Sequence, residues 1–292
     1  MLIGAIEAGG TKFVCGIGDE HGNVQDRISF PTGEPEQTLG QVIGYFQDKK
    51  VEAIGIGTFG PINIDRASAS YGHVTTTPKP GWSNYNFLGR LKREFNLPFG
   101  WDTDVNAAAF GEATWGAAKG LASCVYYTIG TGIGVGVYSE NKLVHGLVHP
   151  EGGHVLTRRH PSDTFDGFCP YHGDCLEGLA AGPAIERRWN IPGSELLPDH
   201  PAWAMEAFYI GQSITNTILM LSPQKIILGG GVMHQMQLFP MIHAEVQKNL
   251  NSYINHSLLI DDIANYIVPP GLGDNAGLCG SLALGVLALK EK

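Results

Sequence analysis

The same order of secondary-structure elements is predicted twice along this chain. In the first half, apolar alternation predicts three strands, and a helix with apolar residues at helical spacing and a buried strand follow them. These segments span residues 2–8, 12–19, 24–31, 34–50 and 51–59. A β-β-β-α-β order of this kind is typical of an α/β lobe.

The order restarts near residue 122. Three strands are again predicted, and the later elements alternate between helix and strand. The strands are expected at 123–130, 131–139, 142–148, 225–230 and 265–270, and the helices at 177–189, 203–221, 234–250 and 275–290. We therefore expect two similar α/β lobes with a cleft between them, an N-terminal lobe over 1–118 and a C-terminal lobe over 119–292. The last helix is a candidate to pack back on the first lobe.

Length, charge and cysteine usage exclude several classes of protein. The chain of 292 residues is long enough for about two domains. Its formal net charge of -9, with no cluster of Lys and Arg, argues against a nucleic-acid surface. The first residues lack the basic segment of a secretion signal, which predicts a cytoplasmic protein. The uncharged run 121–138 carries glycines at alternate positions, so paired strands fit it better than a membrane span.

Three glycine-rich turns are candidates to hold phosphate groups. EAGGTK at 7–12 joins two strands, and its backbone amides together with Lys12 could bind an anion, although a plain hairpin turn is equally possible. IGTGIG at 129–134 has dinucleotide-like spacing, but an extended segment follows it where a Rossmann motif needs a helix. LGGGV at 228–232 links a strand to a helix. Together the three turns predict a nucleotide site.

A carboxylate stands where a strand ends and a helix begins, in WDTDVNAAAF. Asp104 occupies a position where an aspartate most often caps the helix. The same position, at the carboxyl end of a strand, suits a general base that deprotonates an alcohol for attack on a phosphoryl group. Both roles are open at this point, and Asp102 competes for either.

Two cysteines and a histidine lie close together in FCPYHGDCLEG. Cys169, His172 and Cys175 are spaced C-x2-H-x2-C, and His154 upstream completes a set that suits tetrahedral zinc. A chance cluster is the alternative. The substitutes for His154 are His145, His149, His160 and Cys15.

Two glutamates flank these residues. Glu151 precedes His154 by three positions, and Glu177 follows Cys175 by two. A metal ion in the cluster would hold both carboxylates in place. Carboxylates accept hydrogen bonds from sugar hydroxyls, so this arrangement suits a sugar pocket.

Taken together, these motifs resemble the ROK family of sugar kinases and repressors. The resemblance runs nearly end to end and rests on EAGGTK, DTDVNAAA, IGTGIG, PEGGHV, CPYHGDCLEGLAAGPA and LGGGV. HGDCLEG and PEGGH are most similar to the bacterial fructokinase branch. The resemblance implies two ribonuclease-H-like lobes, a fold similar to actin and hexokinase, that close over ATP, Mg²⁺ and a sugar.

The resemblance also implies a role for each motif residue. Asp104 would be the general base that lets the 6-hydroxyl of a hexose, D-fructose in the first place, attack ATP. The residues implied to contact or organise the sugar are Asn106, Glu151, His154 and Glu177. The residues implied to bind ATP are Gly9, Gly10, Thr11, Lys12, Thr131, Gly132, Gly230 and Gly231. The implied zinc ligands are His154, Cys169, His172 and Cys175.

Two positions depart from the family pattern. Glu7 stands where the family often has aspartate, which leaves its part near Mg²⁺ open, and Thr103 replaces an asparagine. The first predicted strand begins at Leu2, without the extra DNA-binding segment of repressor members, so we expect no nucleic-acid partner. The alternatives are a mannokinase or glucokinase, and a sugar-sensing regulator without catalysis. The resemblance further implies a homodimer.

Overall fold

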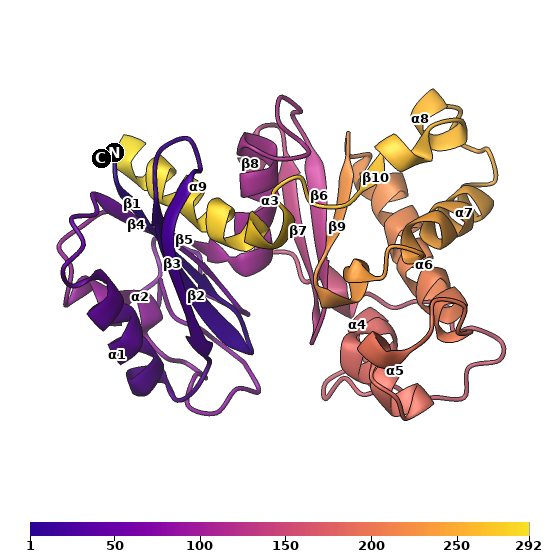
Figure 1. Ribbon diagram of the computed structural model, residues 1–292, viewed down its shortest axis with the longest axis horizontal. Coiled ribbons are helices and arrows are strands. Elements are labelled where there is room, and N and C mark those ends of the chain that lie inside the picture. The colour runs from indigo at the N-terminus through magenta and orange to yellow at the C-terminus, as the bar shows by residue number, and fades with distance from the viewer. Residues whose placement is uncertain (292) are drawn as a thin grey trace. The chain divides into compact units, whose positions relative to one another are not determined.

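Two five-stranded sheets organise the computed structural model, which describes residues 1–291 (Figure 1). The first sheet contains β1 (Ile3–Ala8), β2 (Lys12–Gly18), β3 (Val24–Pro31), β4 (Ala53–Thr58) and β5 (Phe99–Thr103). The second contains β6 (Cys124–Ile129), β7 (Ile133–Ser139), β8 (Lys142–Leu143), β9 (Ile226–Gly229) and β10 (Ile267–Val268). Their strand orders are β3-β2-β1-β4-β5 and β8-β7-β6-β9-β10. Both sheets therefore share one strand order, and the predicted repeat of α/β topology is confirmed.

The chain divides into two compact units. Unit 1 contains residues 1–120, residues 136–150 and the described chain from Gly271 onward, and unit 2 contains residues 121–135 and 151–270. The segment 136–150 and the C-terminal helix thus belong to the same unit as the first sheet.

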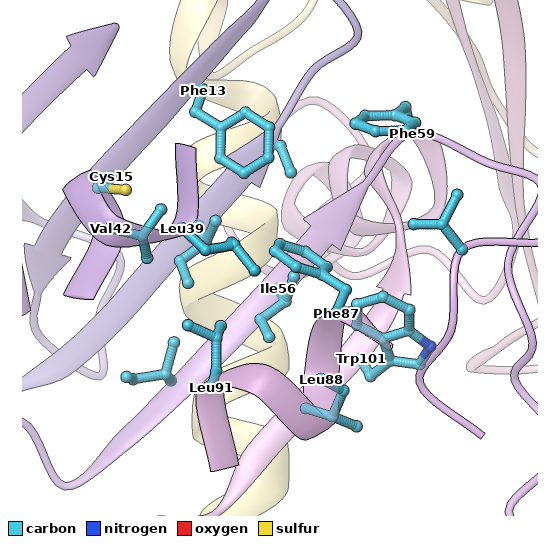
Figure 2. Close-up of a cluster of buried hydrophobic side chains, with 14 of the residues drawn as sticks. Phe13, Cys15, Leu39, Val42, Ile56, Phe59, Phe87, Leu88, Leu91 and Trp101 are labelled. Atoms are coloured by element: carbon cyan, nitrogen blue, oxygen red, sulfur yellow. The ribbon is translucent and has the colours of Figure 1, made fainter. Parts of the chain in front are cut away.

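The first sheet is mixed and is covered on both faces. β1 runs antiparallel to β2 and parallel to β4, and β4 runs parallel to β5. Helices α1 (Pro35–Phe46) and α2 (Phe87–Lys92) cover one face, where Phe13, Ile56 and Trp101 belong to a single buried cluster (Figure 2). Helix α9 (Ala276–Lys290) covers the other face, against Ile3 and Ala5. Burial on both faces explains why β1 and β4 are apolar almost throughout.

Glycines allow α9 to lie directly on the first sheet and on helix α3 (Asp104–Thr114). A Cβ on Gly55 of β4 would lie 1.8 Å from the carbonyl oxygen of Ser281, and a Cβ on Gly280 would lie 1.8 Å from that of Ala107. In addition, Ser281 Oγ donates to the carbonyl oxygen of Ile6 and accepts the N–H of Gly57. The helix backbone therefore packs at a distance that no side chain at Gly55 or Gly280 would permit.

Unit 2 holds most of the second sheet together with its own helices, of which α6 and α7 lie on the β10 side in Figure 1. The helices of unit 2 are α4 (Leu176–Ala180), α5 (Gly182–Trp189), α6 (Ala202–Leu221), α7 (Leu238–Leu250) and α8 (Ser257–Ile260). Helix α6 packs against α7 and α4. Within residues 1–291, no helix has the length and apolar character needed to span a membrane.

Some predicted bounds in the second half were wrong. The helix expected at 177–189 is two helices, because Ala181 is extended and Pro183 stands in the first turn of α5, where proline is favoured. The helix expected from 234 begins at Leu238 and follows a 3-10 turn over Gly231–His234. The strand expected over 142–148 is limited to Lys142–Leu143, and α8 was not predicted.

The contact between β4 and α9 gives a stability prediction. Gly55→Ala inserts a methyl group into backbone atoms of α9 and should lower the free energy of unfolding by about 1–3 kcal/mol. The control is Gly40→Ala on α1, where a Cβ meets nothing within 4 Å, and there the better helix propensity of alanine should raise stability by up to about 1 kcal/mol. Denaturant unfolding measures both variants. Equal stability of the two would contradict the described packing.

Candidate active site

Asp104 is the first residue of α3, directly after β5. Thr103 is the N-cap, and its Oγ1 accepts the N–H of Asn106 at 3.2 Å. Asp104 Oδ1 instead accepts the N–H of its neighbour Val105 at 2.9 Å. The interpretation of Asp104 as the helix cap is therefore wrong, and its carboxyl group is available for another role.

Asp104 and Glu7 form a pair of carboxyl groups with raised pKa values. Burial raises the pKa of Asp104 to about 6, although the hydrogen bond from the N–H of Val105 opposes the shift. Burial, and then the charge of Asp104, raise the pKa of Glu7 to about 7. Gly57 lies opposite Glu7 in the sheet, and a Cβ on Gly57 would be 3.3 Å from Asp104 Cα. A carboxylate whose pKa lies just below neutrality suits a general base.

Asp102 is fixed by its neighbours. It is 2% exposed; Oδ1 accepts the N–H of Thr103 and a proton of Asn106 Nδ2, both at 2.8 Å. His145 Nε2 lies 2.7 Å from Asp102 Oδ2, and this hydrogen bond raises the pKa of His145. Asn106 is itself buried, and its Oδ1 accepts the N–H of Val137. Asp102 and Asn106 therefore stabilise the start of α3 by hydrogen bonds to each other and to the backbone. Asp104, in contrast, accepts a hydrogen bond from the N–H of Val105.

The sequence contained no signal for the Asp102 and His145 pair. The two residues are 43 positions apart, and His145 was considered only as a substitute metal ligand. The pairing depends on segment 136–150 folding into unit 1, which hydrophobic periodicity does not reveal.

The Gly9–Lys12 turn lies at the same edge of the first sheet as Asp104. The N–H of Gly9 donates to the carbonyl oxygen of Lys12, and Thr32 Oγ1 donates to the carbonyl oxygen of Gly9 at 2.7 Å. The adjacent parallel strands β1, β4 and β5 are in register through Thr58, which pairs with Ala8 and Thr103. The residues after these strands therefore emerge together at the carboxyl edge, where open α/β sheets bind ligands.

In unit 2, the Gly130–Gly132 turn contacts Glu177 of α4 and Gly182 of α5. Glu177 Oε2 accepts the N–H of Ile133 at 2.9 Å, and a Cβ on Gly132 would lie 2.6 Å from the same oxygen. The N–H of Gly182 donates to the carbonyl oxygen of Gly130 at 2.7 Å. Thr131 thus stands at the tip of a turn that Glu177 and α5 hold in place.

The other two glycine motifs of unit 2 pack against the same hairpin. Gly230 has a φ of 89°, and a Cβ there would lie 2.5 Å from the backbone nitrogen of Ile129. A Cβ on Gly130 would lie 3.7 Å from the nitrogen of Gly231. Gly153, which follows Glu151 by two, would clash with the carbonyl oxygen of Ile133 if it carried a Cβ. The structure therefore brings the predicted residues of unit 2 together around one turn.

The cluster predicted from the cysteine spacing is present. The potential ligand atoms of His154, Cys169, His172 and Cys175 all lie within 4.8 Å of one another. Nδ1 of His154 is 3.4 Å from the sulfur of Cys175 and 3.7 Å from that of Cys169. Ligand atoms around a tetrahedral ion are about 3.5 Å apart for bonds of about 2.0–2.3 Å. The donor set fits a closed, four-coordinate metal site, and none of the four substitutes belongs to this group in the described chain.

The fold and these features define an α/β protein of the actin and hexokinase class. A ROK hexokinase from Thermus thermophilus has the same fold, with a TM-score of 0.81 and 26% identity over all of both chains. The chain belongs to the ROK family, whose sequence model matches residues 3–287.

Curated relatives are similar over the full length. The chain is 54% identical to a protein of Bacillus subtilis (strain 168), over all of this chain and 97% of that one. It is 50% identical to the fructokinase of Pediococcus pentosaceus over all of both chains. The resemblance seen in the motifs is thus confirmed.

The raised pKa of Asp104 gives a prediction for stability. A folded-state pKa of about 6 lies above the ordinary value of 3.8, so the folded state binds the proton more tightly and loses stability as pH rises through this window. Asp104→Asn cannot ionise and also removes the charge that raises the pKa of Glu7, so its gain in Tm over the wild type should grow between pH 4 and pH 7 and stay constant above pH 8.

Thermal unfolding across this pH range measures the effect. Asp48→Asn, which removes an exposed carboxylate in unit 1, is the matched control. A gain for Asp104→Asn that does not exceed the control at pH 8 would contradict the described burial of Asp104.

Proposed function

We propose that this chain is an ATP-dependent hexose kinase that phosphorylates the 6-hydroxyl of D-fructose and yields fructose 6-phosphate. The observation that carries the proposal is Asp104, a partly buried carboxylate with a pKa of about 6 at the same sheet edge as the Gly9–Gly10 turn. The full-length similarity to the fructokinase of Pediococcus pentosaceus supports fructose as the sugar.

Asp104 is the general base. It accepts the proton of the 6-hydroxyl as the bond from that oxygen to the γ-phosphorus forms and the bond to the β-phosphate oxygen breaks, releasing ADP. Thr103 caps α3, so the carboxylate of Asp104 is not needed as the cap. Asn106 helps to position the start of α3 through its hydrogen bond to Asp102.

The phosphates of ATP are bound by backbone amides and by Lys12. The residues proposed for this role are Gly9, Gly10, Thr11, Lys12, Thr131 and Gly132, and Gly230 and Gly231 are proposed for the adenosine. Mg²⁺ neutralises the phosphates when bound, and Glu7 is its candidate ligand. A dication favours the ionised form of both Glu7 and Asp104, whose mutual repulsion contributes to the raised pKa of Glu7.

The sugar is bound by Glu151, His154 and Glu177. One oxygen of Glu177 accepts the N–H of Ile133, which leaves the other to accept from a sugar hydroxyl. We assign Zn²⁺ to the cluster of two thiolates and two imidazoles, a donor set typical of structural zinc. Zinc bound by Cys175 would hold the start of α4, which carries Glu177.

ATP is a cellular metabolite, so the proposal includes a cytoplasmic location. The homodimer implied by the family stays a prediction, which sedimentation at micromolar concentration tests.

A coupled assay with fructose, mannose and glucose tests the function. We expect the highest kcat/KM with fructose. Activity should fall towards acid, with an apparent pKa of about 6 in kcat/KM and a lower one in kcat, because Asp104 must be ionised and bound Mg²⁺ favours its ionised form. Asp104→Ala should lower kcat by about 100- to 10,000-fold without changing the fold, and Asp48→Ala should not.

The panel also separates the alternatives. Preference for mannose or glucose would favour the other kinases of the family. Absence of product from all three sugars would favour the non-catalytic sensor. Near-normal turnover of Asp104→Ala would remove Asp104 as the base.

Removal of one thiolate tests the metal. Cys169→Ser should abolish zinc binding and lower Tm by several degrees, because metal binding contributes to the stability of the fold. Cys15→Ser, in β2, is the control: it also disturbs a buried cysteine but should retain the metal. Elemental analysis and thermal unfolding measure both. Equal zinc content in the two variants would count against the assigned site.

A further inference from the structure

Lys79 lies over the Gly9–Gly10 turn, although it is 69 positions from Gly10 in the sequence. It belongs to the irregular segment between β4 and α2. A Cβ on Gly10 would lie 2.6 Å from Lys79 Cε and 3.2 Å from its Nζ. The Nζ atom also lies 6.0 Å from the ring centroid of Phe59, the first residue after β4. The ammonium group is thereby placed where β1 and β4 end.

The ammonium group has no counter-ion in the described structure. Across residues 1–291, no carboxylate lies within the 4.0 Å of an ion pair to Lys79, whereas Lys49 and Lys248 each pair with one. Lys79 is partly buried, and this burial lowers its pKa. A partly desolvated cation without an anionic partner is unfavourable, and an anion at the turn would relieve that cost.

Lys79 and Lys12 flank the turn from opposite faces of the sheet. Side chains alternate along β2, so Lys12 projects to the same face as Val14, which packs towards α9. Phe13 projects to the other face, into the cluster that contains Phe59 (Figure 2). Lys79 stands on this second face. A phosphate group seated on the turn would meet an ammonium group from each side.

The position also suits the proposed reaction. Asp104 follows β5, which is two strands from β1, so the turn and the base are about 10 Å apart across the sheet edge. Lys79 lies near the ends of β1 and β4, next to the turn proposed to bind the phosphates of ATP. A cation at this position would lie beside the phosphoryl group before its transfer to the sugar.

We propose that Lys79 is a phosphate-contacting residue whose ammonium group binds oxygens of the terminal phosphates of ATP and stabilises their charge during transfer. This inference rests on the proposed function. Gly10 is part of the same arrangement, because any side chain there would displace Lys79. A lysine stem that merely covers Gly10 and Phe59 is the structural alternative.

Lys79→Met tests the inference, because methionine keeps an apolar stem over Gly10 and removes the charge. We expect kcat/KM for ATP to fall by about 100-fold, as for loss of one donor to a developing charge, and Lys79→Arg to recover at least about tenfold of that loss. The matched control is Lys92→Met. Lys92 is an exposed lysine on α2 whose Nζ lies 5.8 Å from the ring centroid of Tyr71. This variant should stay within about twofold of the wild type.

Calorimetric titration with inorganic tripolyphosphate tests Lys79 without requiring turnover. Lys79→Met should bind tripolyphosphate about tenfold more weakly than Lys92→Met, and adenosine with unchanged affinity. If the wild type turns over no hexose, the proposed function fails, but weaker tripolyphosphate binding by Lys79→Met still establishes the anion site. Equal tripolyphosphate affinity in the two variants overturns the inference, and so does a kcat/KM of Lys79→Met within twofold of an active wild type.

Discussion

The close approach of α9 to β4 and α3 is the contact on which unit 1 depends. Gly55 and Gly280 allow backbone to pack directly on backbone. The hydroxyl group of Ser281 adds hydrogen bonds to the backbone of Ile6 and Gly57. Through this contact the last helix of the chain supports the junction of β5 and α3. Because close-packed backbone cannot shift without losing many contacts at once, the junction is a rigid support for the carboxylate of Asp104.

Asp102 and Asp104 of unit 1 differ in the hydrogen bonds that their carboxylates accept. Asp102 has hydrogen bonds to both oxygens and acts as a structural anchor, whereas Asp104, two residues further on, receives one from the adjacent backbone N–H. Burial then raises the pKa of Asp104 to about 6. Two aspartates in one short motif thus differ in their hydrogen bonds, and a buried carboxylate with a raised pKa is the one that qualifies as a candidate acid or base.

Unit 2 links its motifs through a single turn. The carboxylate of Glu177 bonds to the hairpin at Ile133, and two positions before it Cys175 contributes to the Cys/His cluster. A metal ion in that cluster would therefore act on the hairpin through α4. This connection gives a physical reason for a cysteine-rich loop in a protein whose described cysteines form no disulfide: the loop orients side chains that belong to another motif.

The strand expected over 142–148 is limited to Lys142–Leu143, but most other strands, helix α1, the Cys/His cluster and the family could be predicted from the sequence alone. These depend on local periodicity or on residues within a short spacing, and such signals survive without tertiary context. The cap of α3 at Thr103, the pairing of Asp102 with His145 and the position of Lys79 over Gly10 became known only from the three-dimensional structure. The last two contacts join residues far apart in the chain, and the choice of cap depends on where β5 ends, so each is settled by packing and not by pattern.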